Sequence, residues 1–145
     1  MSESKRPLVG VGVVVLKGVP GAEHVLLIRR AKPPRQGSWS LPGGRQRHGE
    51  TVRAAAAREV MEEAGLEIEV THLLDVVDSL TRDSTGGVAY HYTLVDFAAE
   101  WRAGEPIAGD DAADALWADP SDLDRYTLWD ETVRVIRLAL ERRGA

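Results

Sequence analysis

Three glutamates at helical spacing are the residues of this sequence best suited to chemistry. Glu59, Glu62 and Glu63 stand at i, i+3 and i+4, so an α-helix would stack their side chains on one face. Because like charges at this spacing repel one another, we expect a cationic partner to sit against them. Hard oxygen ligands without His or Cys suit Mg²⁺, with Mn²⁺ as an alternative, better than zinc. The pattern therefore predicts metal-assisted displacement at phosphorus.

Residues around these glutamates suggest how such a site would be built. Gly43 and Gly44 would let the backbone approach a ligand closely, and the Gly43 carbonyl could itself bind a metal. Arg58 could tie down a carboxylate or the loop before the helix. Glu50 is expected to open the helix, where a negative charge is favourable. Taken singly, acidic helix faces are usually solvated and a Gly-Gly pair is usually a turn, so only the combination indicates a site.

The stretch from Gly44 to Leu66 resembles the Nudix box, Gly-x5-Glu-x7-Arg-Glu-U-x-Glu-Glu-x-Gly-U, in which U is an apolar residue. Every fixed position matches: Gly44, Glu50, Arg58, Glu59, Val60, Glu62, Glu63, Gly65 and Leu66. The resemblance implies an α/β fold, an α/β/α sandwich with a mixed β-sheet between helices. It also implies Mg²⁺-dependent hydrolysis of a nucleoside diphosphate linked to another group.

On this resemblance the Gly43 carbonyl, Glu59, Glu62 and Glu63 are the metal-ligand positions. The residues expected to be catalytic are Glu59, Glu62, Arg58 and Asp111, with Glu59 a candidate general base. The family often takes a further acid from a late loop. Here Asp110 or Asp111 could supply it, although an exposed acidic turn is an equal interpretation, and Asp114 and Glu100 are lesser candidates.

We expect Arg30, Trp39, Gly44 and Asp110 to lie on the substrate side. Arg30 ends a predicted strand and could reach a phosphate, with a solvated strand end as the alternative. Trp39 could stack on a base, although a packing role is the stronger interpretation. The lead-in Trp-Ser-Leu-Pro-Gly-Gly and the short chain resemble small ADP-ribose pyrophosphatases.

The favoured substrate is therefore ADP-ribose, cleaved to AMP and ribose 5-phosphate. A MutT-like nucleoside triphosphate pyrophosphohydrolase is the alternative, and the loops 79–87 and 109–114 would decide between them. A nucleotide-binding regulator without hydrolytic activity is the alternative of another class. Such proteins often lose the glutamates of the box, whereas all three are present here. A homodimer is an expectation from the family alone.

The surrounding pattern predicts the elements that must hold these residues. Trp129, Val133, Ile136 and Leu140 recur at helical spacing, so we expect a C-terminal amphipathic helix with Trp129 anchored in the core and Thr127 as its cap. The helix carrying the glutamates is expected over 50–64, ended by Gly65. Strands are predicted over 10–16, 25–28, 39–41, 66–77, 88–98 and 115–118, and loops over 18–23, 31–38 and 104–114.

Length and composition limit the class of protein. The 145 residues fit one domain, 1–145, that is 43% hydrophobic and 28% charged. A net charge of −5 argues against binding nucleic acid by bulk phosphate neutralisation and leaves a small-molecule partner. No apolar run approaches the roughly 20 residues of a membrane span. The chain has no cysteine and shows no secretory signal, so we expect a cytoplasmic protein without a membrane partner.

Overall fold

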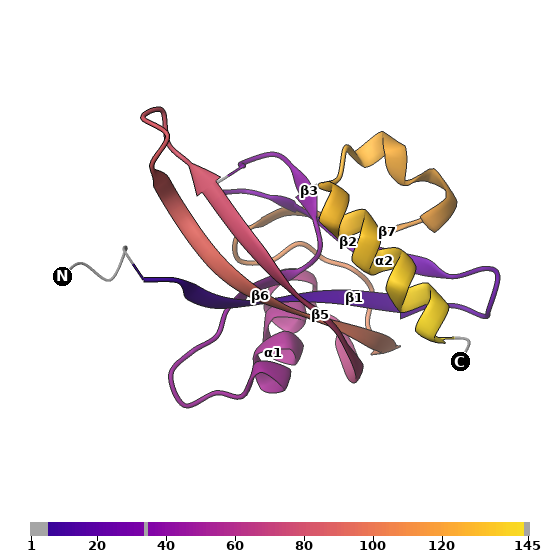
Figure 1. Ribbon diagram of the computed structural model, residues 1–145. Helices are drawn as coiled ribbons and strands as arrows, with labels where there is room; N and C mark the ends of the chain where they lie inside the picture. Colours follow the sequence, from indigo (N-terminus) through magenta and orange to yellow (C-terminus); the bar gives the residue numbers. More distant parts are fainter. Residues whose placement is uncertain (1–5, 34, 144–145) are drawn as a thin grey trace.

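Two α-helices lie on opposite faces of a seven-stranded mixed sheet (Figure 1). The computed structural model describes residues 6–33 and 35–143. No helix in this part of the chain is long and apolar enough to cross a membrane. The elements are, in order, β1 (Leu8–Lys17), β2 (His24–Arg30), β3 (Trp39–Ser40), β4 (Gly43–Arg45), α1 (Val52–Ala64), β5 (Glu67–Arg82), β6 (Val88–Ala103), β7 (Ala112–Ala118), the 3₁₀-helix η2 (Pro120–Tyr126) and α2 (Asp130–Arg143).

The sheet is mixed because β1 pairs in parallel with β6, whereas its other partners are antiparallel. Its main order is β3-β2-β1-β6-β5, with β4 paired to β1 and β7 paired to β2. β1 and β2 form an antiparallel hairpin whose register holds only two residue pairs. Beyond them β1 continues beside β4 and β2 continues beside β7, so the two strands diverge.

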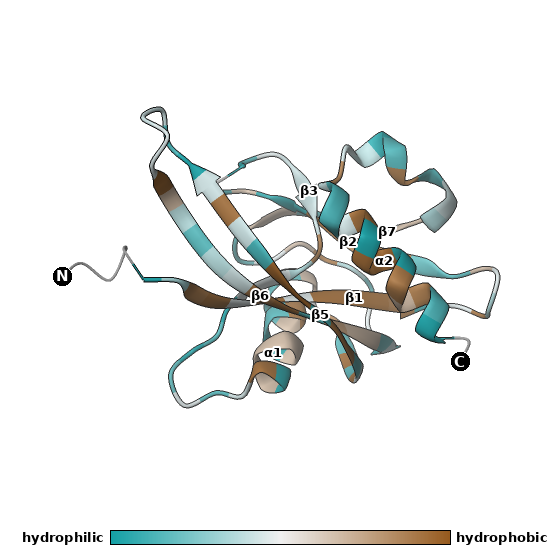
Figure 2. Ribbon diagram, in the orientation of Figure 1, coloured by the Kyte–Doolittle hydropathy of each residue, from teal (hydrophilic) through white to brown (hydrophobic). Residues whose placement is uncertain are grey.

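Side chains that alternate along β1 contribute to the hydrophobic core on both faces of the sheet. Val11, Val13 and Val15 pack on the α1 side, whereas Val14 and Leu16 pack on the α2 side. All five are buried, and Figure 2 shows the hydrophobic colouring along this strand. Successive side chains of a strand point to opposite faces, so a strand buried on both faces reads as a continuous apolar run. The predicted sandwich with a mixed sheet is therefore confirmed.

Helix α1 begins two residues later than predicted. Thr51 has an extended backbone and its hydroxyl accepts a hydrogen bond from Ala54 N at 3.0 Å, which makes Thr51 the N-cap. Glu50 thus lies before the helix. The predicted stop is confirmed: Gly65 adopts a left-handed conformation (φ 72°) and its N–H bonds the Met61 carbonyl.

The β5–β6 hairpin is longer than the sequence pattern predicted. β5 reaches Arg82 instead of residue 77, and β6 reaches Ala103 instead of residue 98. Among the added residues 78–82 and 99–103 the buried one is Ala99, so the added ends carry a weak hydrophobic signal. At the tip Asp83 accepts hydrogen bonds from the N–H groups of Thr85 and Gly87.

Three expectations for the C-terminal part are wrong. The predicted loop 104–114 ends earlier because β7 begins at Ala112, where pairing with β2 orders the chain. Thr127 does not cap α2; its left-handed backbone (φ 50°) closes η2 instead. Trp129 is 37% exposed and is not a core anchor, because it precedes α2 and Arg35 lies over its ring.

Candidate active site

A cleft of about 1350 Å³ contains the acidic face of α1. Its walls come from β1, β2, β4, α1, β6, the loop before β7 and the start of α2. The structure brings to this cleft each of the predicted site residues: Arg30, Trp39, Gly43, Gly44, Arg58, Glu59, Glu62, Glu63, Asp110 and Asp111. It does not bring Asp114 or Glu100 there, and Glu100 instead pairs with Arg143.

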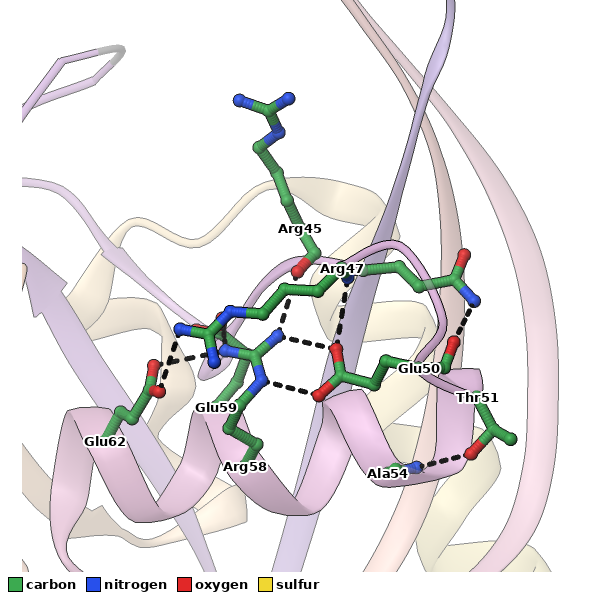
Figure 3. A network of polar contacts seen from close by, with 9 residues as sticks. Arg45, Arg47, Glu50, Thr51, Ala54, Arg58, Glu59 and Glu62 are labelled. Carbon is green, nitrogen blue, oxygen red and sulfur yellow. Dashed lines mark hydrogen bonds and ion pairs between the residues drawn. The ribbon is translucent and has the colours of Figure 1, made fainter.

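Arg58 connects the acidic face of α1 to the preceding loop (Figure 3). Its Nε and Nη2 donate to the two carboxylate oxygens of Glu50 at 2.6 and 2.8 Å, and Nη2 also donates to the Arg45 carbonyl. Its Nη1 donates to Glu59 at 2.6 Å and to Glu62 at 3.1 Å. The hydrogen bond from Arg58 lowers the pKa of Glu50 to about 2. The cation expected against the glutamates is thus Arg58, supplemented by Arg47, which bonds Glu62 at 3.2 Å.

Glu63 is the buried member of the three glutamates, with 6% of its surface exposed. Its Oε1 accepts a hydrogen bond from Gly43 N at 2.8 Å, which fixes the carboxyl against β4. Burial, together with the nearby Glu59 carboxylate, raises the pKa of Glu63 to about 8. At this position the Glu63 carboxyl is therefore stable either in its protonated, neutral form or in its ionised form beside a cation.

Glu59 packs directly on the backbone of β4. A Cβ atom built on Gly44 would lie 2.6 Å from the Glu59 carboxyl carbon, so only glycine leaves this space. Within residues 6–33 and 35–143, no three His, Cys, Asp or Glu side chains are arranged as a preformed metal site. Guanidinium groups bind oxygens of both Glu59 and Glu62. The predicted ligand set stays a prediction.

The loop carrying Asp110 and Asp111 docks on the end of α1. Ile107 N donates to the Ala64 carbonyl and Gly109 N donates to the Glu63 carbonyl, both at 3.0 Å. The Asp111 carboxylate lies 2.8 Å from Lys32 Nζ, and both side chains are largely exposed. The loop thus brings Asp110 and Asp111 to the cleft that also contains the glutamates, and their predicted roles stay predictions.

Arg30 and Trp39 line the cleft from the ends of β2 and β3. Arg30 is close enough to Glu63 for its charge to lower the pKa of that carboxyl against the larger effect of burial. Trp39 makes an edge-to-face contact with Tyr126 at 5.5 Å between ring centres, and the Arg29 guanidinium lies 5.9 Å from its ring. These contacts support the packing interpretation of Trp39, although its half-buried ring still lines the cleft.

Two buried polar residues in this cleft were not predicted. Asp96 on β6 is 5% exposed and Thr132 on α2 is 8% exposed, and both line the cleft. The sequence did carry a signal for Asp96, because it interrupts the apolar run 94–99 with a charge. Thr132 carried none, because a threonine in a helix is usually unremarkable.

Comparison with known proteins identifies the class. The NUDIX domain family model matches residues 6–139. The chain therefore belongs to the NUDIX family and is a Nudix hydrolase, an enzyme that acts on phosphoric anhydride bonds.

Relatives within this family differ in their named substrates. The chain is 36% identical to an ADP-ribose pyrophosphatase of Methanocaldococcus jannaschii over 88% of this chain and 70% of that protein. It is also 36% identical to a putative 8-oxo-dGTP diphosphatase 2 of Mycobacterium tuberculosis over 77% of this chain and 75% of that protein.

Solved structures agree with the fold. The NUDIX domain of Shewanella oneidensis NrtR, crystallised with ADP ribose, superposes with a TM-score of 0.75 at 25% identity, covering 96% of this chain and 90% of that one. A MutT NUDIX hydrolase from Burkholderia pseudomallei superposes with a TM-score of 0.70 at 32% identity, covering 94% and 98%.

Proposed function

We propose that this enzyme cleaves the diphosphate bridge of ADP-ribose to give AMP and ribose 5-phosphate, in a Mg²⁺-dependent reaction. The observation that carries the proposal is the gathering of Glu59, Glu62 and Glu63 beside Gly43 and Gly44 in one cleft. Three carboxylates on one wall repel a bare diphosphate unless cations intervene, so the site fits a substrate that arrives with divalent metal.

The residues present fit such a metal by their chemistry. The donors are hard carboxylate oxygens and a backbone carbonyl, which suit Mg²⁺, with Mn²⁺ as an alternative. Burial of Glu63 beside Glu59, which raises the pKa of Glu63, is a charge imbalance that a dication would relieve. We infer that Glu59, Glu62, Glu63 and the Gly43 carbonyl would hold it. A bound Mg²⁺ would supply Lewis-acid stabilisation of the charge that develops on the phosphate oxygens.

We assign the remaining catalytic roles to side chains of the protein. Glu59 is our candidate general base, since its Oε1 is held by Arg58 at 2.6 Å and its carboxyl faces the cleft at Gly44. Arg58 acts as a positioning residue, because it restrains Glu59 and Glu62 together. Arg30, which also lines the cleft, is our candidate for binding a phosphate. Asp111 is the candidate for a further acid from the loop before β7.

The choice of ADP-ribose rests on relatives. Support comes from the named activity of the Methanocaldococcus relative and from ADP ribose in the NrtR complex. A MutT-like triphosphate pyrophosphohydrolase is the second candidate, favoured by the Mycobacterium relative at the same identity over a smaller part of this chain.

A hydrolysis panel tests the proposal. The purified protein with Mg²⁺ should be assayed on ADP-ribose, NADH, a sugar nucleotide, a diadenosine polyphosphate and the common nucleoside triphosphates. We expect ADP-ribose to give the highest kcat/KM, with AMP and ribose 5-phosphate as products. A higher value for a nucleoside triphosphate would replace ADP-ribose by the second candidate.

Glu63→Gln tests the site itself. Because the substitution removes one negative charge and a ligand oxygen from the carboxylate cluster, we expect turnover to fall on the order of 100-fold, with an unchanged circular dichroism spectrum. Glu67→Gln is the matched control, because Glu67 is exposed and lies outside the cleft. Retention of full turnover by Glu63→Gln would show that the glutamates of α1 are not the hydrolytic centre.

A further inference from the structure

Asp96 places a carboxyl group inside the cleft on the α2 side of the sheet. Its neighbours on β6 alternate: Leu94 and Ala98 pack on the α2 side, whereas Val95 and Phe97 pack on the α1 side. Asp96 therefore points toward α2. It is 5% exposed and lines the same cleft as the glutamates of α1. The cleft thus extends from the acidic cluster to a second carboxyl on the other face of the sheet.

The carboxyl group of Asp96 occupies space that a glycine leaves open. Gly12 on β1 is its parallel neighbour in register. A Cβ atom at Gly12 would lie 2.4 Å from Asp96 Oδ1, closer than any side chain allows. The Asp96 side chain therefore lies across the backbone of β1, and any other residue at position 12 would force it to move.

Within residues 6–33 and 35–143, no group donates a hydrogen bond to the carboxyl group of Asp96. The hydroxyl of Thr132, which is also buried and lines the cleft from α2, likewise makes no hydrogen bond there. Their oxygen atoms are not sealed inside the protein, because in the described residues the fully buried side-chain polar atoms without a partner are Trp117 Nε1 and Arg143 Nη1. Both groups are therefore open to the cleft, where a ligand that displaces water must supply their hydrogen bonds.

The charges around Asp96 do not supply that partner. Burial raises the pKa of Asp96 to about 6, and the nearby carboxylates Asp75 and Glu131 act in the same direction. Arg134 opposes them, but its guanidinium is already hydrogen-bonded to Asp75 and Glu131. At neutral pH most of the Asp96 carboxyl groups are thus ionised and available as acceptors.

We propose that Asp96, assisted by Thr132, is a specificity-determining site that binds the non-phosphate group of the substrate and requires it to present two adjacent hydrogen-bond donors. Two carboxylate oxygens can accept two parallel donors at once. The vicinal hydroxyls of a ribose and the N1–H and N2–H edge of a guanine both offer such a pair. A ligand group without this pair leaves the buried carboxylate unsatisfied and is rejected. This inference rests on the proposed function in one respect, namely that the ligand is a nucleotide derivative.

Equilibrium binding tests this site without hydrolysis. Titrations in Mg²⁺, with the bridging oxygen of each probe replaced by a methylene group so that the probe cannot be hydrolysed, should compare ADP-ribose with ADP and GDP with IDP. The members of the first pair differ by the terminal ribose, which ADP-ribose carries on its second phosphate, and those of the second pair differ by the guanine amino group. We expect wild-type protein to bind one preferred member about tenfold or more tightly than its counterpart, and Asp96→Asn to lose that preference.

The variants separate a binding role from a structural one. Asp96→Asn keeps the size of the side chain, and Thr132→Val removes only the hydroxyl, for which we expect a smaller loss. Asp78→Asn is the matched control, because Asp78 is exposed on the neighbouring strand β5 and does not line the cleft. In hydrolysis, Asp96→Asn should raise KM with little change in kcat, since it removes binding shared by the ground and transition states.

Each outcome decides the proposal. Loss of the ADP-ribose preference in Asp96→Asn supports a ribose diol as the partner, and loss of the GDP preference supports guanine. Unchanged affinities of Asp96→Asn for all four probes, or no binding of any probe by the wild type, would overturn it. If the wild type binds with this preference but hydrolyses none of the panel, the proposed function fails while the role of Asp96 stands.

Discussion

At the scale of single residues, Arg58 shows how one cation can organise a cluster of like charges. Its guanidinium reaches Glu50, Glu59, Glu62 and the Arg45 carbonyl. Only the planar, five-donor fork of arginine can satisfy acceptors in so many directions, whereas lysine offers a compact point charge. Arg58 therefore has both a structural and a positioning role.

Replacing Arg58 tests these two roles separately. We expect Arg58→Ala to lower the free energy of unfolding by an amount on the order of 2 kcal/mol, because charged hydrogen bonds of a half-buried network are lost. Arg58→Lys should recover much of the stability but little of kcat/KM, since a single ammonium cannot hold Glu59 and Glu62 together. Urea denaturation and steady-state kinetics measure the two effects. Arg53→Ala, an exposed arginine of the same helix, is the control, and equal activity of Arg58→Lys and wild type would contradict the positioning role.

At the scale of elements, the site depends on contacts between α1 and two segments distant in sequence. β4 meets α1 through the hydrogen bond from Gly43 N to Glu63, and the loop before β7 meets its end through Ile107 and Gly109. The two hydrogen bonds from the loop satisfy carbonyl groups that the last turn of a helix leaves without partners. The docking of the loop therefore places Asp110 and Asp111 at the rim of the cleft.

Gly109→Ala tests whether that docking matters. A Cβ atom at Gly109 would lie 2.6 Å from the Glu62 carbonyl oxygen, so the loop must shift away from α1. We expect a stability loss of about 1–3 kcal/mol and a fall in kcat if Asp111 takes part in hydrolysis. Thermal unfolding and turnover per folded molecule are the measurements. Gly87→Ala in the β5–β6 turn is the control, and full turnover of both Gly109→Ala and Asp111→Asn would remove Asp111 from the mechanism.

At the scale of the whole molecule, buried carboxyl groups in the cleft lower the stability of the fold in return for function. Asp96 and Glu63 are both desolvated and both have a raised pKa. A folded-state pKa above the unfolded value means that the folded protein holds the proton more tightly. Ionisation therefore destabilises the fold as pH rises. Such groups are common where a site needs them and rare elsewhere.

Asp96→Asn should therefore stabilise the protein at neutral pH. The pKa rises from 3.8 in the unfolded chain to about 6 in the fold, so the penalty of the wild type develops between these values and is complete above them. We expect the variant to gain up to about 3 kcal/mol at pH 7.5 and almost nothing near pH 4. Denaturation at several pH values measures this difference, and Asp78→Asn should show no such trend. A constant difference across the range would mean that Asp96 is not the titrating group.

The sequence by itself determined the chemistry and the helix that carries it. Helical spacing places Glu59, Glu62 and Glu63 on one face by local geometry alone, and the box pattern around them identified the family. The left-handed cap at Gly65 and the existence of the predicted strands are likewise local properties, so the sequence predicted them. The errors fell where local signals were weak, as at the C-terminal ends of β5 and β6 and at Thr127.

Only the tertiary structure decided what surrounds the glutamates. That Gly43 and Gly44 lie against their carboxyls, and that the loop before β7 docks on the end of α1, depends on segments that are distant in sequence. The position of Asp96 over Gly12 is the clearest case. The alternation of residues along a strand predicts which face of the sheet a side chain lies on. Which glycine of β1 lies beside Asp96 depends on the register between β1 and β6, and no local sequence pattern encodes that register.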